Sequence, residues 1–250
     1  MRDSLYRELY KFTHKKITWF APMIMVGFMV FMVSYPGARL LTMLTYDSSD
    51  AITLVLVIVG STMFSMEFQN NAILTLLYKS PKKIDVYVAK LITIFVYDII
   101  LHCLALLLTI VLELTIKPVS WMSVYQYHQP LVVNMISATG IDIITSMLII
   151  SLIFLASTLI NSNATVITVT MVIVFFGRGI SADLMNYNSP LKPLARWNPL
   201  NMTMLTSQYG NYSMYHETTI LTNFQILFGA MAYVIVFLGL GYLVFRKKRF

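Results

Sequence analysis

The sequence predicts an all-α membrane protein with six transmembrane helices, and three observations support this. Hydrophobic residues make up 58% of the 250 residues and charged residues only 12%, whereas a soluble domain has about 25% charged residues. The apolar residues gather into long runs, and a membrane helix needs about 20 mainly apolar residues. The basic residues cluster between alternate runs. A soluble enzyme, a disordered chain and a disulfide-built secreted module are all excluded.

The six expected spans cover residues 17–34, 51–66, 91–116, 131–160, 164–184 and 220–245. The second run is short, so we expect it to extend by a turn at one end. The fourth is too long to lie straight across a bilayer, so it tilts or projects. The first is interpreted as a retained helix, because no small-residue cleavage motif follows its apolar run.

The basic residues predict the orientation of these spans. Of the 18 Lys and Arg residues, 13 lie before the first span, between the second and third, or after the sixth. Cytoplasmic loops carry such an excess of Lys and Arg, so both termini are expected in the cytoplasm. The net charge of +7 then reflects topology, and no nucleic-acid partner is expected.

Two segments are expected to form helices too short to span. Residues 1–16 place Leu5, Leu9 and Phe12 at i, i+4 and i+7, which predicts an amphipathic helix in the cytoplasmic interface; the alternative is a basic juxtamembrane tail. Residues 185–217 are apolar but broken by prolines. Short helices dipping into the outer leaflet are expected there, packed on protein; the alternative is a mobile loop.

Residues 67–90, between the second and third spans, hold the most informative pattern. Ile73, Leu76 and Leu77 predict the apolar face of a short helix. Ser80-Pro81 stops that helix and can start the next one, which leads into the third span. A short helix held between two spans is suited to being pushed by a partner protein. An amphipathic loop resting on lipid fits the same pattern, which does not decide between them.

In this topology, residues 67–90 resemble the membrane subunits of type-2 ABC exporters. Those subunits follow the second span with a glutamate, a Gly-Thr pair, a leucine-rich short helix, a proline, a basic residue and a lysine that enters the third span. Glu67, Pro81 and Lys90 match this pattern. Asn71-Ala72 replaces Gly-Thr and Gln69 replaces a common arginine, so the glutamate-to-proline spacing is the main motif. The layout of the whole chain is also similar.

The resemblance implies roles for these segments. Residues 1–16 would be a connecting helix, and the segment from Asn71 to Lys79 a coupling helix that docks in a groove of a separate ATP-binding subunit. Two six-span subunits, either copies or siblings, would frame one pathway in a bacterial plasma membrane. A compact subunit looks like the group that handles amphipathic peptides, in bacteriocin self-protection, bacitracin resistance and peptide-toxin export. The expected ATPase-coupling residues are Glu67, Asn71, Ile73, Leu76, Leu77, Lys79, Pro81, Lys82 and Lys83.

No catalysis is expected in this chain. The phosphate-binding motif G-x-x-x-x-G-K-[ST] does not occur in it, so ATP and Mg²⁺ are expected in the partner ATPase. Its four histidines are scattered and none has metal-ligand spacing. No metal and no cofactor are therefore expected to bind.

Five polar residues within the expected spans are candidates for a transport pathway: Asp98, His102, Glu113, Asp142 and Arg178. A charge at the bilayer centre costs about 2.5–3.5 kcal/mol on insertion scales, so these residues should face protein or a wet cavity. One interpretation is a polar lining that contacts the charged part of a substrate. The interpretation favoured here is helix–helix hydrogen bonds and an ion pair, for example Asp142 with Arg178.

Two other functions fit the same sequence. In a proton-coupled secondary transporter, Asp98, His102 and Asp142 would carry protons. Such transporters often contain internal repeats, and none is clear here. A non-transporting membrane scaffold or sensor is the other alternative.

Overall fold

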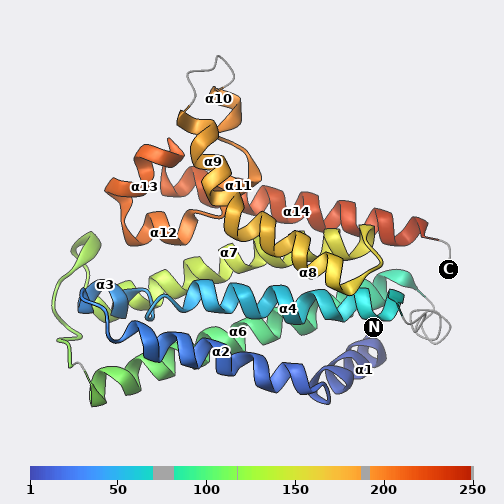
Figure 1. The fold of residues 1–250 in the computed structure, drawn as a ribbon, viewed down its shortest axis with the longest axis horizontal. Coiled ribbons are helices and arrows are strands. Elements are labelled where there is room, and N and C mark those ends of the chain that lie inside the picture. Colours follow the sequence, from blue (N-terminus) through green and yellow to red (C-terminus); the bar gives the residue numbers. More distant parts are fainter. Residues whose placement is uncertain (70–81, 117, 187–191, 249–250) are drawn as a thin grey trace.

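The computed structural model describes residues 1–69, 82–116, 118–186 and 192–248. Within these ranges the structure is helical, apart from connecting loops and an isolated bridge between Val124 and Pro130. Long helices run side by side (Figure 1). In the described part of the chain, five helices are long and apolar enough to cross a membrane, and a sixth is added if the bent pair α1–α2 counts as one span. The all-α membrane fold is confirmed.

The long helices overlap the expected spans but end at different residues. They are α2 (Lys16–Met32), α4 (Ser48–Gln69), α6 (Lys83–Thr115), α7 (Leu131–Leu159), and α14 (Asn223–Lys247). The remaining one is α8 (Asn163–Met171), which continues through a π-helical turn η2 (Val172–Phe176) into α9 (Gly177–Asn186). α4 is longer than 51–66 at both ends. α6 begins before residue 91, so at 33 residues and a rise of about 1.5 Å per residue it is longer than the hydrocarbon core of a bilayer is thick.

Short helices connect the long helices or precede them in the chain. α1 (Arg2–Thr13) meets α2 at an angle of 62°. α3 (Ala38–Met43) precedes α4, and the 3₁₀ turn η1 (Gln126–His128) precedes α7. Between α9 and α14 lie α10 (Lys192–Ala195), α11 (Pro199–Met202), α12 (Leu205–Gly210) and α13 (Tyr212–Thr219).

The described residues of 192–217 form short helices packed on the bundle. Asn198 caps α11 by accepting a 2.9 Å hydrogen bond from the backbone N–H of Asn201, and Pro199 occupies the first turn, where its missing N–H costs nothing. Met202, Leu205 and Gln208 are buried. The Gln208 amide donates to the carbonyl of Leu221 at 2.9 Å, which ties α12 to the segment that leads into α14.

The core lies around α7, whose Ile149, Ile153 and Phe154 side chains are fully or almost fully buried. Phe64 of α4 meets Phe154 edge to face with ring centroids 5.2 Å apart, and it meets Phe245 of α14 in the same manner at 5.5 Å. Tyr87 of α6 meets Phe154 at 5.6 Å. Such edge-to-face pairs add to the apolar burial. These four rings therefore join α4, α6, α7 and α14 at one end of the bundle.

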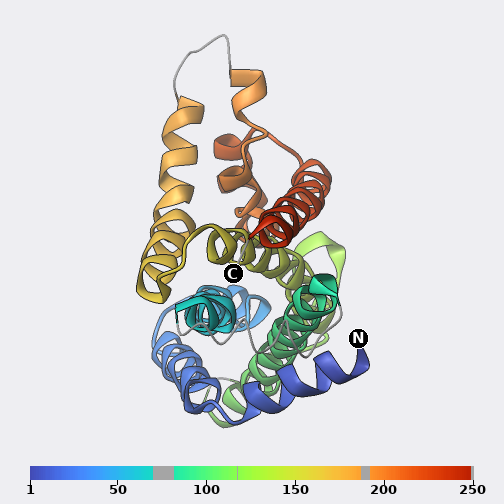
Figure 2. The same ribbon diagram turned by 90° about the vertical axis from the view of Figure 1, so that its right-hand side faces the viewer.

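Both termini lie at that end, which we call the terminal end (Figure 1). The N-terminal amine lies 3.3 Å from the Asp85 carboxylate of α6. Lys83 donates to the backbone carbonyls of Arg246 and Lys248 at 3.1 and 2.8 Å. The start of α6 therefore holds both ends of the chain. Figure 2, turned by 90°, brings this end toward the viewer.

Packing of α14 generates a test. A Cβ added at Gly241 would lie 2.7 Å from Tyr87 Oη and 3.4 Å from the Leu155 backbone, whereas one at Gly239 would meet nothing within 4 Å. We expect Gly241→Ala to lower stability by about 1–3 kcal/mol through overpacking. Thermal unfolding of the purified protein in detergent measures this, with Gly239→Ala as the control. Equal melting temperatures for the two variants would contradict the observed packing.

Candidate functional site

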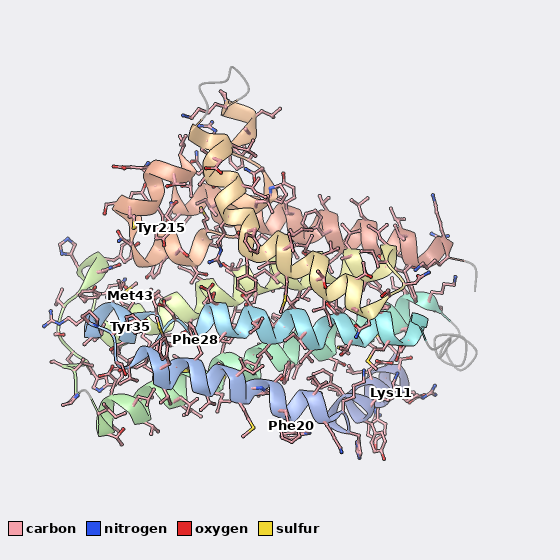
Figure 3. The ribbon with its side chains drawn as sticks, in the orientation of Figure 1. Lys11, Phe20, Phe28, Tyr35, Met43 and Tyr215 are labelled. Atoms are coloured by element: carbon pink, nitrogen blue, oxygen red, sulfur yellow. The ribbon has the colours of Figure 1, made fainter. Side chains whose placement is uncertain are left out.

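Four charged side chains form a buried cluster at the terminal end, which we call the ionic cluster: Glu8, Lys11, Glu67 and Lys90. The Lys90 ammonium is fully buried and lies 2.5 Å from Glu67 and 2.8 Å from Glu8. The Lys11 ammonium lies 2.6 Å from Glu8 and 2.7 Å from Glu67. Each carboxylate is therefore shared by two ammonium groups. Figure 3 labels Lys11 on α1 at this end.

The cluster joins three helices. Glu8 and Lys11 come from α1, Glu67 from the last turn of α4, and Lys90 from the third turn of α6. Lys90 also donates to the Met63 carbonyl of α4 at 2.9 Å. A buried ion pair is stable only with good geometry and further hydrogen bonds, because desolvation is costly. Here each ion has at least two partners, which fixes α1 against α4 and α6.

Glu8 was not a candidate in the sequence analysis, although its spacing could have identified it. Glu8 lies in the run 5, 8, 9 and 12, which is the apolar stripe of α1. In the structure Glu8 and Phe12 are the buried residues of this helix, while Tyr6 and Tyr10 are exposed. An acidic residue within an apolar stripe indicates a partner on another element.

Electrostatics keep Glu8 and Lys11 charged near neutral pH. Burial raises the pKa of the Glu8 carboxyl, but Lys90 and Lys11 outweigh burial and hold that pKa below the ordinary 4.5. Burial lowers the pKa of Lys11, but Glu67 and Glu8 outweigh it and raise that pKa above the ordinary 10.5. The stability from Glu8 is thus present above its unfolded pKa and lost as pH falls through the folded value. The stability from Lys11 is lost only at high pH.

The predicted coupling residues fall partly outside the described residues. Asn71, Ile73, Leu76, Leu77, Lys79 and Pro81 all do so. Glu67 belongs to the ionic cluster, Lys82 is exposed, and Lys83 donates to the carbonyls of Arg246 and Lys248 at the C-terminal end of α14. Since α4 ends at Gln69 and α6 begins at Lys83, the ionic cluster lies beside both ends of the connection between these helices.

A second buried polar group, which we call the histidine network, lies deeper in the bundle. His102 of α6 has Nδ1 3.2 Å from Asp98 Oδ1 and Nε2 3.1 Å from Asp142 Oδ2 of α7. Asp142 Oδ1 accepts hydrogen bonds from Ser49 of α4 at 2.6 Å and from Thr206 of α12 at 2.9 Å. One carboxylate therefore connects four helices.

The prediction that Asp142 forms an ion pair with Arg178 is wrong. Arg178 lies 3.1 Å from Asp50 at the start of α4, and Asp142 pairs with His102 instead. Asp50 and Asp142 both line a cavity of about 50 Å³, together with Asp47, Ser49 and Thr206 among others. Asp142 therefore lies between the buried imidazole and a small acidic cavity.

Glu113 is buried on the same helix as His102 but belongs to a separate contact. Its carboxylate accepts hydrogen bonds from Tyr46 Oη at 2.6 Å and from the Thr42 hydroxyl. Tyr46 is the middle of three consecutive residues, Thr45 to Asp47, with φ of 50–53°. Non-glycine residues in this region carry strain, so the Glu113 contact holds a strained turn between α3 and α4.

The ionic cluster gives a prediction for Lys90. Lys90→Met leaves the two buried carboxylates of Glu8 and Glu67 with the single ammonium of Lys11, and we expect a loss of about 3–5 kcal/mol because one buried negative charge is no longer compensated. The melting temperature in detergent should fall accordingly. Lys16→Met, at an exposed lysine of the same region, is the control. An unchanged melting temperature for Lys90→Met would show that the cluster does not stabilise the fold.

The histidine network gives a prediction for Asp142. Asp142→Ala removes the partner of His102, Ser49 and Thr206, so we expect the amount of folded protein in the membrane to fall sharply. Asp183→Ala, at an exposed carboxylate of α9, should leave it unchanged. Size-exclusion profiles of the extracted protein measure this. Normal folding of Asp142→Ala with a selective loss of transport would instead assign Asp142 to the pathway.

Comparison with known proteins completes the description of the site. The model of the ABC-2 family transporter protein family matches residues 4–177, which is more than half of the chain. The match includes Glu8, Glu67 and Lys90 of the ionic cluster and the His102–Asp142 pair. No curated protein matches the chain. On the extent of the family match, the chain belongs to the ABC-2 family of transporter proteins, as a multi-pass membrane component.

Proposed function

We propose that this chain is the permease subunit of an ATP-driven exporter, moved by a separate ATPase subunit. The observation that carries the proposal is the ionic cluster in a chain of the ABC-2 family. It binds α1 to the last turn of α4 and the third turn of α6. A force applied at the connection between α4 and α6 would therefore move these three helices together.

The proposed mechanism is alternating access. ATP binding would bring two ATPase subunits together, and the segment from Asn71 to Lys79 would receive that movement as a coupling helix. α4 and α6 are also linked through Ser49, Asp142 and His102, so the movement would reach α7 and α12. ATP and Mg²⁺ would bind to the ATPase, and the second membrane subunit would be a copy or a sibling of this chain.

The terminal end would face the cytoplasm of a bacterium. The basic residues near both termini and around residues 79–90 support this orientation. The proposed cargo is an amphipathic peptide such as a toxin or an antimicrobial peptide, which rests on resemblance to compact type-2 exporter subunits. A staphylococcal exporter of phenol-soluble modulins, a bacteriocin-immunity permease and a bacitracin-resistance permease are the specific candidates.

A proton-coupled transporter remains the second candidate because of one observation. His102 lies between two buried carboxylates, and Asp142 adjoins an acidic cavity. Groups of this kind form proton relays in membranes. Flux in proteoliposomes that is driven by a proton gradient without ATPase, and abolished by His102→Gln, would favour this function over the exporter. A scaffold or sensor would show no flux under either condition.

The ATPase partnership has a direct test. The chain is co-expressed with a candidate ABC ATPase, and the complex is purified in nanodiscs. We expect stable co-purification and an altered ATPase rate. Charge reversal at Lys79 and Lys82, or polar replacement of Leu76 and Leu77, should lower transport at least tenfold while membrane insertion persists. Lys192→Glu, on α10, which projects sideways from the long helices (Figure 1), is the matched control.

Two results would overturn the proposal. One is cargo movement by the purified chain alone, without an ATPase. The other is normal ATPase binding and transport by the Lys79/Lys82 and Leu76/Leu77 variants, which would remove the coupling role from the segment Asn71–Lys79.

A further inference from the structure

A cavity of about 320 Å³ lies at the end of the bundle opposite the termini, between η1, α7, α12 and the start of α14. The cavity beside Asp142 is about 50 Å³ by comparison. Pockets that bind small organic groups start at about 300 Å³ and combine an apolar lining with a few polar groups. This cavity is therefore large enough for one or two amino-acid side chains.

The lining of the cavity is amphipathic and uncharged. Ile141, Leu205, Phe224 and Leu227 supply apolar surface, and Tyr127, Gln129, Ser137, Tyr209 and Asn223 supply polar groups. Phe224 is 75% exposed, so the cavity is open to the surroundings at the first turn of α14. A ligand can enter the cavity through this opening at the first turn of α14.

Contacts among the lining residues hold the cavity open. Tyr127 and Tyr209 stack with ring centroids 4.8 Å apart, and the Tyr127 hydroxyl donates to the Tyr209 carbonyl at 2.9 Å. Asn223 donates to the Tyr127 hydroxyl at 3.5 Å and accepts from Gln208 at 2.9 Å. Tyr127 has a φ of 53°, a strained conformation that persists only where neighbours enforce it. The site is therefore preformed.

One acceptor at this cavity lacks a donor. Gln129 lines the cavity, and its Oε1 is buried in the observed conformation and accepts no hydrogen bond from the described residues. A ligand donor reaches this oxygen once the Gln129 side chain turns toward the cavity. A buried acceptor without a partner is costly, so a ligand that brings an N–H or O–H group would be favoured. A lipid acyl chain brings no such donor, and no lining residue carries a positive charge to bind a phosphate headgroup.

We propose that this cavity binds the uncharged, apolar part of an amphipathic peptide, with a peptide N–H donating to Gln129. The inference rests on the proposed function and assigns the cargo a contact site. The lining residues come partly from the segment before residue 177, where the family match ends, and partly from the segment after it. Leu205, Tyr209 and the α14 residues lie beyond that match.

Binding to the full chain in nanodiscs tests the site without any ATPase. The probe is a fluorophore-labelled, 20-residue amphipathic helical peptide. We expect saturable binding to the unaltered chain, weakened at least tenfold by Leu227→Trp, which fills the cavity. Gln129→Leu should weaken binding about fivefold, as for one lost hydrogen bond. Ile235→Trp, on an exposed part of the same helix, is the matched control and should bind normally.

Melting temperatures of the variants separate misfolding from lost binding. Absence of saturable binding to the unaltered chain, or unchanged binding by a folded Leu227→Trp variant, would overturn the site. So would displacement of the peptide by lysophosphatidylglycerol at equal concentration, which would indicate a lipid site. If the ATPase complex forms and transports but peptide binding is insensitive to Leu227→Trp, the proposed function survives and this site does not. If peptide binding is lost in Leu227→Trp but no ATPase complex forms, this site survives and the proposed function does not.

Discussion

Burial of charge away from water is the constraint on which this structure depends. An ionised side chain in a low-dielectric interior is tolerated only when other groups compensate its lost hydration. The fully buried Lys90 meets this requirement with two carboxylates and a carbonyl. Asp142 meets it with an imidazole and two hydroxyls. In both cases the partners come from different helices, so satisfying the charge also fixes the arrangement of helices.

These two groups connect the same helices at different heights. The ionic cluster joins α4 to α6 near the terminal end, and the histidine network joins them again through α7, between His102 and the first turn of α4. Between the two connections, buried apolar residues of both helices, such as Val59 of α4 and Ile94 of α6, belong to one core. α4 and α6 can therefore move as a pair more easily than they can slide past each other. The proposed transmission of movement from an ATPase to the rest of the bundle requires this.

The fold class could be predicted from the sequence because each membrane span is recognised from the hydropathy of its own residues, without knowledge of its neighbours. Less of the sites could be predicted because pairing depends on the rotation of each helix about its axis. Asp98 and His102 share a face by spacing alone, but the partner of Asp142 was assigned to Arg178 when it is His102. Glu8 was overlooked because a charge on an amphipathic helix is usually assigned to its solvated face. Choosing His102 over Arg178 as the partner of Asp142 requires tertiary contacts, whereas the position of Glu8 within the apolar stripe of α1 is visible in the sequence.

The π-helical turn Val172–Phe176 changes how the last part of this span must be compared with related chains. A π turn accommodates one residue more than an α turn, and each residue of an α-helix advances by about 100°. Side chains beyond Phe176 are therefore rotated relative to an uninterrupted helix, including Arg178 where it meets Asp50. In a homologue with one residue fewer here, an α-helical turn would replace the π-helical turn. The residue at the position of Arg178 would then keep its orientation about the helix axis. Alignments of this region should accordingly place their gap at 172–176.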